Sequence, residues 1–244
     1  MQLSVVIPSY NEAHQIGQTL QTVVEFCRRE CSAWEVLVVD DGSTDGTAQI
    51  VASAGRVQCL RNAQNRGKGY SVRRGMLAAQ YDPILFSDAD LSTPIEEMLA
   101  LQAALQEGAD IAIASRKPSA KTVERLWHRR LMAGTFRWLV KILALRGFHD
   151  TQCGFKLFRR SATRTVFGLQ TIDRWGFDVE ILYIARKKKL RVVEVPVAWQ
   201  EAEQSQVGAI TPLTMVGDLL RVRWNDLRGR YRNPTPEVRP RDED

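Results

Sequence analysis

The feature that most constrains the fold is an alternation, over the first 116 residues, of short apolar runs with segments of helical character. The apolar runs predict strands at residues 3–7, 34–39, 56–60, 83–87 and 110–115. Helical spacing and capping residues predict helices between them, at 13–28, 45–54, 67–80 and 94–106. Near-continuous apolar strands that alternate with helices are typical of a mostly parallel sheet covered on both faces. The predicted class is therefore α/β.

Beyond residue 116 the regular alternation of predicted strands and helices ends. A polar, proline-containing loop at 117–121 precedes a long stretch at 123–145 that is both basic and apolar and has helical spacing. The later elements are predicted as strands at 154–158 and 191–197, helices at 161–167, 177–188 and 212–228, and a flexible loop at 200–214. One domain is expected over residues 1–230, and the proline-rich, charged composition of 231–244 predicts a disordered tail.

The composition limits the classes of binding partner and the cellular compartment that are expected. The net charge of +6 and the pI near 9.3 favour anionic partners, whether phosphates, anionic lipid or nucleic acid. The four cysteines form no Cys-x-x-Cys pair and the three histidines are scattered, which argues against a zinc site. The opening MQLSVVIPSYNE does not resemble a signal peptide, and no run reaches the roughly 18 to 20 apolar residues that span a bilayer. A reducing, cytoplasmic setting without a membrane span is the expectation.

Three polar clusters directly follow predicted strands, where open parallel sheets bind their ligands. They are residues 8–12 (PSYNE), 40–43 (DDGS) and 88–90 (DAD). In the last cluster, Asp88 and Asp90 are two residues apart on extended backbone, so both carboxylates are expected on one side. Their mutual repulsion favours a bound cation. Turn and capping chemistry at residues 41–45 explains part of the second cluster, but it does not explain why all three strand ends are polar and acidic.

Six motifs carry a resemblance to a known family: VVIPSYNE, VVDDGSTDGT, RNAQNRGKG, SDADLSTP, DTQCGFKLF and WGFDVEIL. Through them the chain resembles family 2 glycosyltransferases of the GT-A fold. Within that family it is most similar to polyprenyl-phosphate glycosyltransferases of the dolichyl-phosphate β-glucosyltransferase type, whose mannosyl counterpart is a relative. The motifs occur in order over about residues 4–223, in the expected strand–loop–helix context.

The resemblance implies a Rossmann-like GT-A sheet with a nucleotide-binding half at 1–116, an acceptor-binding half at 117–230, and amphipathic interface helices after the fifth strand. It implies inverting, metal-dependent transfer of a hexose to a polyprenyl phosphate. The motif SDADLSTP resembles the corresponding motif of enzymes that use UDP-glucose more than that of enzymes that use GDP-mannose. Another donor, such as GDP-mannose or UDP-GlcNAc, or a hydroxyl acceptor on a saccharide, is the alternative.

The resemblance also assigns residues. Asp88 and Asp90 are expected to hold Mg²⁺ or Mn²⁺, because both ions prefer oxygen ligands and are commonly bound by one or two carboxylates plus substrate phosphates. The nucleotide side comprises Pro8, Tyr10, Glu12, Asp40, Lys68 and Asp88. The expected catalytic residues are Asp90, Arg116 and Arg130, the two arginines gripping the lipid phosphate. The acceptor side also comprises Gln152, Asp150 and Asp178, of which the two aspartates become candidate bases if the acceptor is a hydroxyl.

Lys68 and Arg130 each have a plainer interpretation, as a solvated loop lysine and as a surface or snorkelling arginine. The stretch 126–145 places Arg130, Arg137 and Lys141 on one stripe, opposite an apolar arc that includes Trp127 and Trp138. Such a helix suits a membrane interface, although packing on the protein's own core is its commoner use. The predicted location is the cytoplasmic face of a membrane, with peripheral attachment. In the late loop, Gln206 stands where the family often has a lysine.

Three other functions make different demands on the sequence. A sugar nucleotidyltransferase needs a glycine-rich loop after the first strand, where this chain has PSYNE. A nucleic-acid-binding module needs basic and aromatic residues interleaved on one face, and the acidic strand ends would repel its ligand, so no nucleic-acid partner is predicted. A sugar-nucleotide sensor would bind the donor without consuming it.

Overall fold

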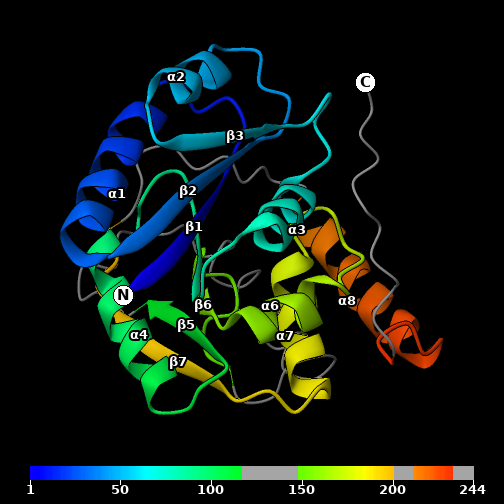
Figure 1. The fold of residues 1–244 in the computed structure, drawn as a ribbon. Helices are drawn as coiled ribbons and strands as arrows, with labels where there is room; N and C mark the ends of the chain where they lie inside the picture. The colour runs from blue at the N-terminus through cyan, green and yellow to red at the C-terminus, as the bar shows by residue number, and fades with distance from the viewer. Residues whose placement is uncertain (117–147, 201–210, 233–244) are drawn as a thin grey trace, which may run out of the picture.

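The computed structural model describes residues 1–116, 148–200 and 211–232. Its centre is a seven-stranded sheet with the order β3-β2-β1-β4-β6-β5-β7 (Figure 1). The strands are β1 (Gln2–Ser9), β2 (Ala33–Asp40), β3 (Val57–Arg61), β4 (Ile84–Ser87), β5 (Ile111–Arg116), β6 (Phe155–Phe158) and β7 (Val192–Val197). β6 runs antiparallel to both of its neighbours, and the other paired strands are parallel. The predicted mostly parallel α/β class is confirmed.

Helices cover both faces of the sheet. The helices are α1 (Ile16–Glu30), α2 (Thr47–Ser53), α3 (Lys68–Ala78), η1 (Ile95–Glu97), α4 (Met98–Gln106), α6 (Arg160–Phe167), α7 (Phe177–Lys187) and α8 (Thr211–Leu227). One core packs α1, α2 and α4 on the sheet, and a second core packs α3, α6, α7 and α8 on its other face. In β1, Val5 and Ile7 enter the first core while Val6 enters the second, as the alternation of a strand requires. This is why the strand reads as a continuous apolar run.

The predicted elements are found in the predicted order within the described residues, including α8 near 212–228. The sequence did not predict the position of β6, which inserts between β4 and β5 and pairs with both of them. Strand order depends on contacts between segments about 70 residues apart in the chain, and local periodicity carries no information about those partners. The stretch 123–145, with Arg130, and the late loop with Gln206 lie outside the described residues.

The expected boundary of the tail at residue 231 is wrong. Tyr231 is fully buried, and its hydroxyl donates a hydrogen bond of 2.7 Å to Oε1 of Glu180. Asn225, which is also buried, lies 3.5 Å from the same hydroxyl. The composition predicted that this segment is exposed to solvent. The ring of Tyr231 instead packs in the core beside α7 and α8. Among the described residues, no helix is long and apolar enough to cross a membrane.

Candidate active site at the carboxyl edge of the sheet

The three polar clusters meet at one edge of the sheet, as predicted. Ser9, at the end of β1, pairs in register with Asp40 at the end of β2, and β4 pairs with β1 on its other side. Parallel strands present their carboxyl ends at a common edge, so the loops that follow them become neighbours. The site is built from these loops and from the start of α3.

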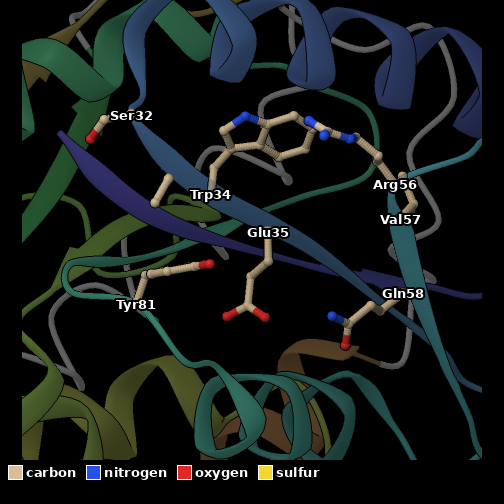
Figure 2. Close-up of a pocket in the computed structure, with 8 residues that line it drawn as sticks. Ser32, Trp34, Glu35, Arg56, Val57, Gln58 and Tyr81 are labelled. Carbon is tan, nitrogen blue, oxygen red and sulfur yellow. The ribbon is translucent and has the colours of Figure 1, made fainter.

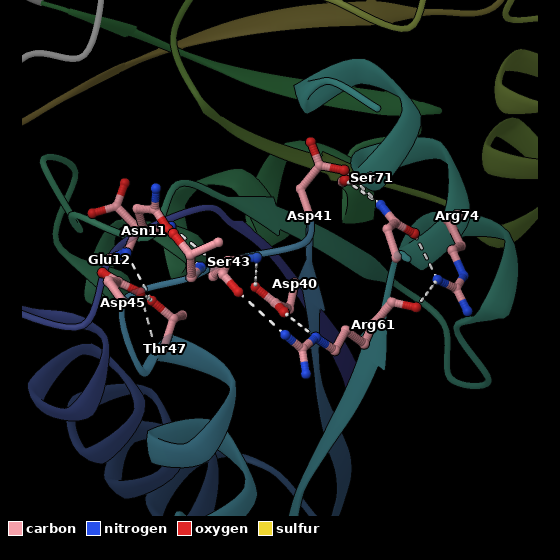
Figure 3. Close-up of polar contacts among 12 residues, drawn as sticks. Asn11, Glu12, Asp40, Asp41, Ser43, Asp45, Thr47, Arg61, Ser71 and Arg74 are labelled. Atoms are coloured by element: carbon pink, nitrogen blue, oxygen red, sulfur yellow. Dashed lines mark hydrogen bonds and ion pairs between the residues drawn. The ribbon is translucent and has the colours of Figure 1, made fainter. Parts of the chain in front are cut away.

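Side chains tie the loops after β1 and β2 to each other (Figure 3). The backbone N–H of Asn11 donates to Oγ of Ser43 at 2.9 Å, and the N–H of Thr44 donates back to Oδ1 of Asn11 at 2.9 Å. The N–H of Glu12 donates to Oγ1 of Thr47 at 2.9 Å. Asn11 has a φ of +54°, a left-handed conformation that asparagine tolerates well. These contacts fix the backbone that presents Glu12 to the site.

Adjacent aspartates have different tasks (Figure 3). Asp40 is fully buried, accepts a hydrogen bond from the N–H of Ser43 at 3.2 Å and lies 3.2 Å from the guanidinium of Arg61. Asp41 accepts hydrogen bonds from Asn62 Nδ2 at 2.7 Å and from the N–H of Gly67 at 2.8 Å. Asp41 therefore shapes the loop that leads into α3. The sequence did not predict this role, because Asp41 followed by Gly42 is also typical of a local turn.

Lys68 is the first residue of α3 and points into the site. Its Nζ lies 2.6 Å from Oδ1 of Asp88, and the side chain is only 22% exposed. The ammonium also lies over Trp175, 5.3 Å from the ring centroid. Burial opposes the charge of Lys68, but the carboxylates of Asp88, Asp178 and Asp90 outweigh it and raise the pKa of the lysine. The interpretation as a solvated loop lysine is wrong for this structure.

Asp88 and Asp90 follow β4 and share their surroundings with Glu12. The N–H of Asp88 donates to the carbonyl oxygen of Gly154 at 2.9 Å, and Oδ1 of Asp90 accepts from the N–H of Ser92 at 3.0 Å. Burial raises the pKa of Glu12, and the charges of Asp90 and Asp88 raise it further. Glu12 therefore lies within electrostatic range of both aspartates at the carboxyl edge.

The surroundings of Asp88 fit a divalent cation. Its Oδ1 is buried, and its contact with Lys68 is an ion pair without hydrogen-bond geometry. The backbone of Gly154 lies so close that an added Cβ would stand 1.9 Å from Oδ2 of Asp88. Within the described ranges no cluster of three or more His, Cys, Asp or Glu side chains forms a metal cage. A cation here would draw on Asp88 and Asp90 and would need its other ligands from a substrate, as Mg²⁺ and Mn²⁺ accept.

A buried ion pair lies beside this centre. Lys156, in β6, is fully buried, and its Nζ donates to Oδ1 of Asp178 at 2.5 Å and to the carbonyl oxygen of Cys153 at 2.6 Å. Burial raises the pKa of Asp178, although the cations of Lys156 and Lys68 oppose the shift. Lys156 was not among the predicted site residues. Its signal was present, since a single lysine interrupts an otherwise apolar strand.

The WGFD motif positions the start of α3 against the start of α7. A Cβ on Gly69 would stand 2.7 Å from Cβ of Phe177, and one on Gly67 would stand 2.5 Å from the carbonyl oxygen of Asp173. Phe177 packs edge-on against Phe86 of β4, with ring centroids 5.9 Å apart. This close packing fixes the position of Lys68 relative to β4. Asp88 is the first residue after that strand.

Arg116 and Asp150 form a bidentate pair at the end of β5. Nε and Nη2 of the arginine lie 2.6 and 2.8 Å from the two carboxylate oxygens, and the N–H of Arg116 donates to the same side chain at 3.1 Å. Burial would raise the pKa of Asp150, but Arg116 outweighs it and lowers that pKa. The structure thus pairs two residues for which separate roles were predicted.

Three other predicted site residues differ in their exposure. Gln152 is exposed on the loop after Asp150, Tyr10 is 37% exposed directly after β1, and Pro8 is buried in β1.

A cavity of about 470 Å³ lies at the opposite edge of the sheet, where β2 and β3 begin (Figure 2). Trp34, Glu35, Arg56 and Tyr81 contribute to its lining. Oε1 of Glu35 accepts hydrogen bonds from Oγ of Ser4 and the N–H of Gln80, both at 2.5 Å, so this carboxylate links β2 to β1 and to the loop that precedes β4. The cavity is separate from the carboxyl-edge site.

Comparison with known proteins gives concordant results. The model of glycosyl transferase family 2 matches residues 4–167. A dolichyl-phosphate β-glucosyltransferase of Saccharomyces cerevisiae is 36% identical over 95% of this chain and 77% of its own length. The human protein of the same name is 34% identical over 95% of this chain and 78% of its own length. The protein so named from Dictyostelium discoideum is 34% identical over 93% and 75%.

Solved structures share the fold. Mannosyl-3-phosphoglycerate synthase from Rubrobacter xylanophilus superposes with a TM-score of 0.71 at 22% identity, covering 100% of this chain and 79% of that one. Glucosyl-3-phosphoglycerate synthase from Mycobacterium tuberculosis, in complex with Mn²⁺, UDP and glucosyl-3-phosphoglycerate, gives 0.62 at 20% identity, covering 97% and 81%. At these identities the likeness concerns the fold alone.

Proposed function

The chain belongs to glycosyl transferase family 2, and from this premise we propose that it transfers glucose from UDP-glucose to a polyprenyl phosphate of the dolichyl type. The names of the curated relatives support the sugar and the acceptor. The observation that carries the proposal is the convergence of Asp88, Asp90 and Lys68 at the carboxyl edge, with Lys68 2.6 Å from Asp88. Two carboxylates and a cation suit a bound nucleoside diphosphate and its metal.

Asp88 and Asp90 would hold a divalent cation, either Mg²⁺ or Mn²⁺. The solved complex of the Mycobacterium tuberculosis enzyme with Mn²⁺ and UDP supports this choice of cofactor class. When bound, the metal supplies Lewis-acid stabilisation to the leaving nucleoside diphosphate. Lys68 is placed to add positive charge beside the same diphosphate. Asp40, Tyr10, Pro8 and Glu12 line the nucleotide side of the site.

The two candidate bases favour a phosphate acceptor over a hydroxyl. Asp150 is held by Arg116 with a lowered pKa, which makes it a weak proton acceptor. Asp178 is buried and already paired with Lys156. A phosphate monoester has a second pKa of about 6 and attacks as a mostly dianionic nucleophile without a strong base. The transfer would invert the anomeric carbon, with Arg116 and Arg130 seating the lipid phosphate at the cytoplasmic face of a membrane.

Donor turnover tests the proposal. Purified protein is incubated with Mg²⁺ or Mn²⁺, a short water-dispersible polyprenyl phosphate, and UDP-glucose, UDP-GlcNAc or GDP-mannose in parallel. Glucose on the lipid phosphate from UDP-glucose is the expected product. Transfer from another donor would correct the sugar, and transfer only to a saccharide hydroxyl would replace the acceptor. UDP-glucose binding without consumption under all these conditions would indicate a sensor instead.

Gly154→Ala is expected to weaken Mn²⁺ binding in the presence of UDP by roughly 10–100-fold, the usual effect of disturbing the support of a ligand. The added methyl group collides with the carboxylate of Asp88 and must displace it. Isothermal titration calorimetry measures the affinity, and circular dichroism checks the fold. Gly217→Ala is the matched control, because nothing lies within 4 Å of a Cβ at that exposed position. An unchanged Mn²⁺ affinity in Gly154→Ala would show that Asp88 is not a ligand.

A further inference from the structure

We propose that three side chains hold Arg116 in the orientation in which it receives the acceptor phosphate. The three are Asp150, Glu194 and Trp199, and we call them the Arg116 support. Arg116 is the last residue of β5, and its side chain is 39% exposed, so a ligand can reach it. The inference rests on the proposed function, which assigns the phosphate to this arginine. It adds Glu194 and Trp199, neither of which was among the predicted site residues.

Asp150 fixes one edge of the guanidinium. Nε and Nη2 of Arg116 lie 2.6 and 2.8 Å from the two carboxylate oxygens, and the backbone N–H of Arg116 adds a third contact at 3.1 Å. A bidentate pair of this kind sets the plane of the arginine fork. Nη1 is the guanidinium nitrogen that the pair leaves for another ligand. Because the charges of the two residues offset each other, Asp150 contributes direction and not positive charge.

Glu194 of β7 fixes the backbone that carries Asp150. Its Oε1 accepts hydrogen bonds from the N–H of Asp150 and the N–H of His149, both at 2.9 Å, and its Oε2 lies 2.9 Å from Nδ1 of His149. Val193 and Val195 pack in the core formed by α1, α2 and α4, so the alternation of the strand directs Glu194 to the other face. There the carboxylate, only 15% exposed, meets the loop and ties it to β7.

Trp199 bounds the guanidinium on a further side. β5 and β7 are parallel neighbours, with Arg116 in register with Val197, so Trp199 follows beside the arginine (Figure 1). The guanidinium carbon lies 5.5 Å from the ring centroid of Trp199, which is the geometry of a cation–π contact. The N–H of Gln200 donates to the carbonyl oxygen of Ser92 at 2.8 Å. This bond links the backbone beside Trp199 to the loop after β4, which carries the proposed metal ligands.

The charges of the support make its role testable by the sign of an effect. When ionised, Asp150 and Glu194 bring two negative charges to the one positive charge of Arg116. If attraction alone seated the phosphate, removing either carboxylate would strengthen acceptor binding, because like charges repel. If the carboxylates orient the arginine, removing either one would weaken acceptor binding. The structure favours orientation, because both carboxylates are spent on hydrogen bonds that fix this loop.

Steady-state kinetics with UDP-glucose and a short, water-dispersible polyprenyl phosphate tests the support. Glu194→Gln and Asp150→Asn are each expected to raise the KM for the acceptor by about tenfold, a typical loss for hydrogen bonds to a charged group. The kcat at saturating acceptor and the KM for UDP-glucose should stay close to the wild-type values. An orientation effect on the acceptor predicts this division, whereas general damage to the fold does not.

Trp199 is tested by two substitutions of the same position. Trp199→Leu should raise the KM for the acceptor by about 2–5-fold, which corresponds to an exposed contact between a cation and a ring. Trp199→Phe keeps an aromatic face and should restore most of the wild-type KM. Equal KM values for the two variants would remove the cation–π contact from the support.

Glu35→Gln is the matched control. Glu35 is 6% exposed and also accepts a hydrogen bond from a backbone N–H, that of Gln80, but it lies at the opposite edge of the sheet. It makes the same chemical change as Glu194→Gln at a buried carboxylate that fixes a loop. Thermal melts compare the stability of the two variants. The control should keep the wild-type KM for the acceptor even where it lowers the melting temperature.

An unchanged or lowered acceptor KM in Glu194→Gln and Asp150→Asn would overturn the proposal. Loss of kcat at saturating acceptor in Asp150→Asn would also overturn it, because that aspartate would then be a base. Failure of the wild type to glucosylate the polyprenyl phosphate would refute the proposed function instead. Calorimetric titration with inorganic phosphate, with UDP and Mn²⁺ saturating, then tests the support alone. Binding weakened about tenfold in both carboxylate variants would support it. Equal affinities, or no phosphate binding by the wild type, would overturn it.

Discussion

Asp90→Asn is expected to lower kcat for glucosyl transfer by about 10³-fold or more, comparable with the loss of a principal charge-stabilising group in an enzyme site. The substitution removes one of the two carboxylates proposed to bind the metal. It leaves the ion pair between Lys68 and Asp88 in place. Because the negative charge of Asp90 raises the pKa of Glu12, the two carboxylates repel, and removing the charge of Asp90 should leave the metal-free fold as stable as the wild type or more so.

Two readouts separate this effect from damage to the fold. Single-turnover kinetics with saturating UDP-glucose and Mn²⁺ measures the loss, and a thermal melt without metal measures stability. Asp82→Asn is the control: it makes the same chemical change on the exposed loop before β4, where Oδ1 accepts a hydrogen bond from the N–H of Arg160. The control should keep wild-type activity. Near-normal turnover by Asp90→Asn would remove Asp90 from the metal site.

Lys156→Met should destabilise the protein by about 3–5 kcal/mol, because it leaves the buried carboxylate of Asp178 without its cation. Methionine matches the length of the lysine stem, so the loss comes from the charge and not from a large cavity. The double variant Lys156→Met, Asp178→Leu removes both charges and should recover much of the loss. Urea unfolding measures the free energies. A single variant as stable as the double variant would show that the pair contributes little.

The pH dependence gives a second test of the same pair. Burial raises the pKa of Asp178, and removing Lys156 takes away a cation that opposes this shift. An acid whose pKa is raised in the folded state stabilises that state at low pH. The contribution disappears as the pH rises above its unfolded pKa of about 3.9. The penalty of Lys156→Met should therefore be larger at neutral pH than near pH 4, and a penalty independent of pH would contradict this account.

The sequence alone determined the class of fold and the place of the site. The alternation of apolar runs and helices is set by local burial and periodicity, which each segment carries in its own residues. The polar ends of three predicted strands located the site before any coordinates, because parallel strands must present those ends together. The six motifs identified the family. Asp88 and Asp90 were selected from residue type and spacing and Lys68 from the resemblance to the family, and the structure brings the three side chains together.

Which residues pair within this fold depends on long-range contacts that the sequence did not predict. β6 inserts between β4 and β5, and this brings Lys156 to Asp178 and Gly154 to Asp88. The same folding joins Arg116 to Asp150, which turns a candidate base into the partner of a cation. The physical reason is the difference in sequence separation. A periodic pattern is informative only over neighbouring residues, whereas a buried charge is paired with whichever group the folded chain places beside it. Such partners lie 22 to 66 positions apart here, and no local pattern records them.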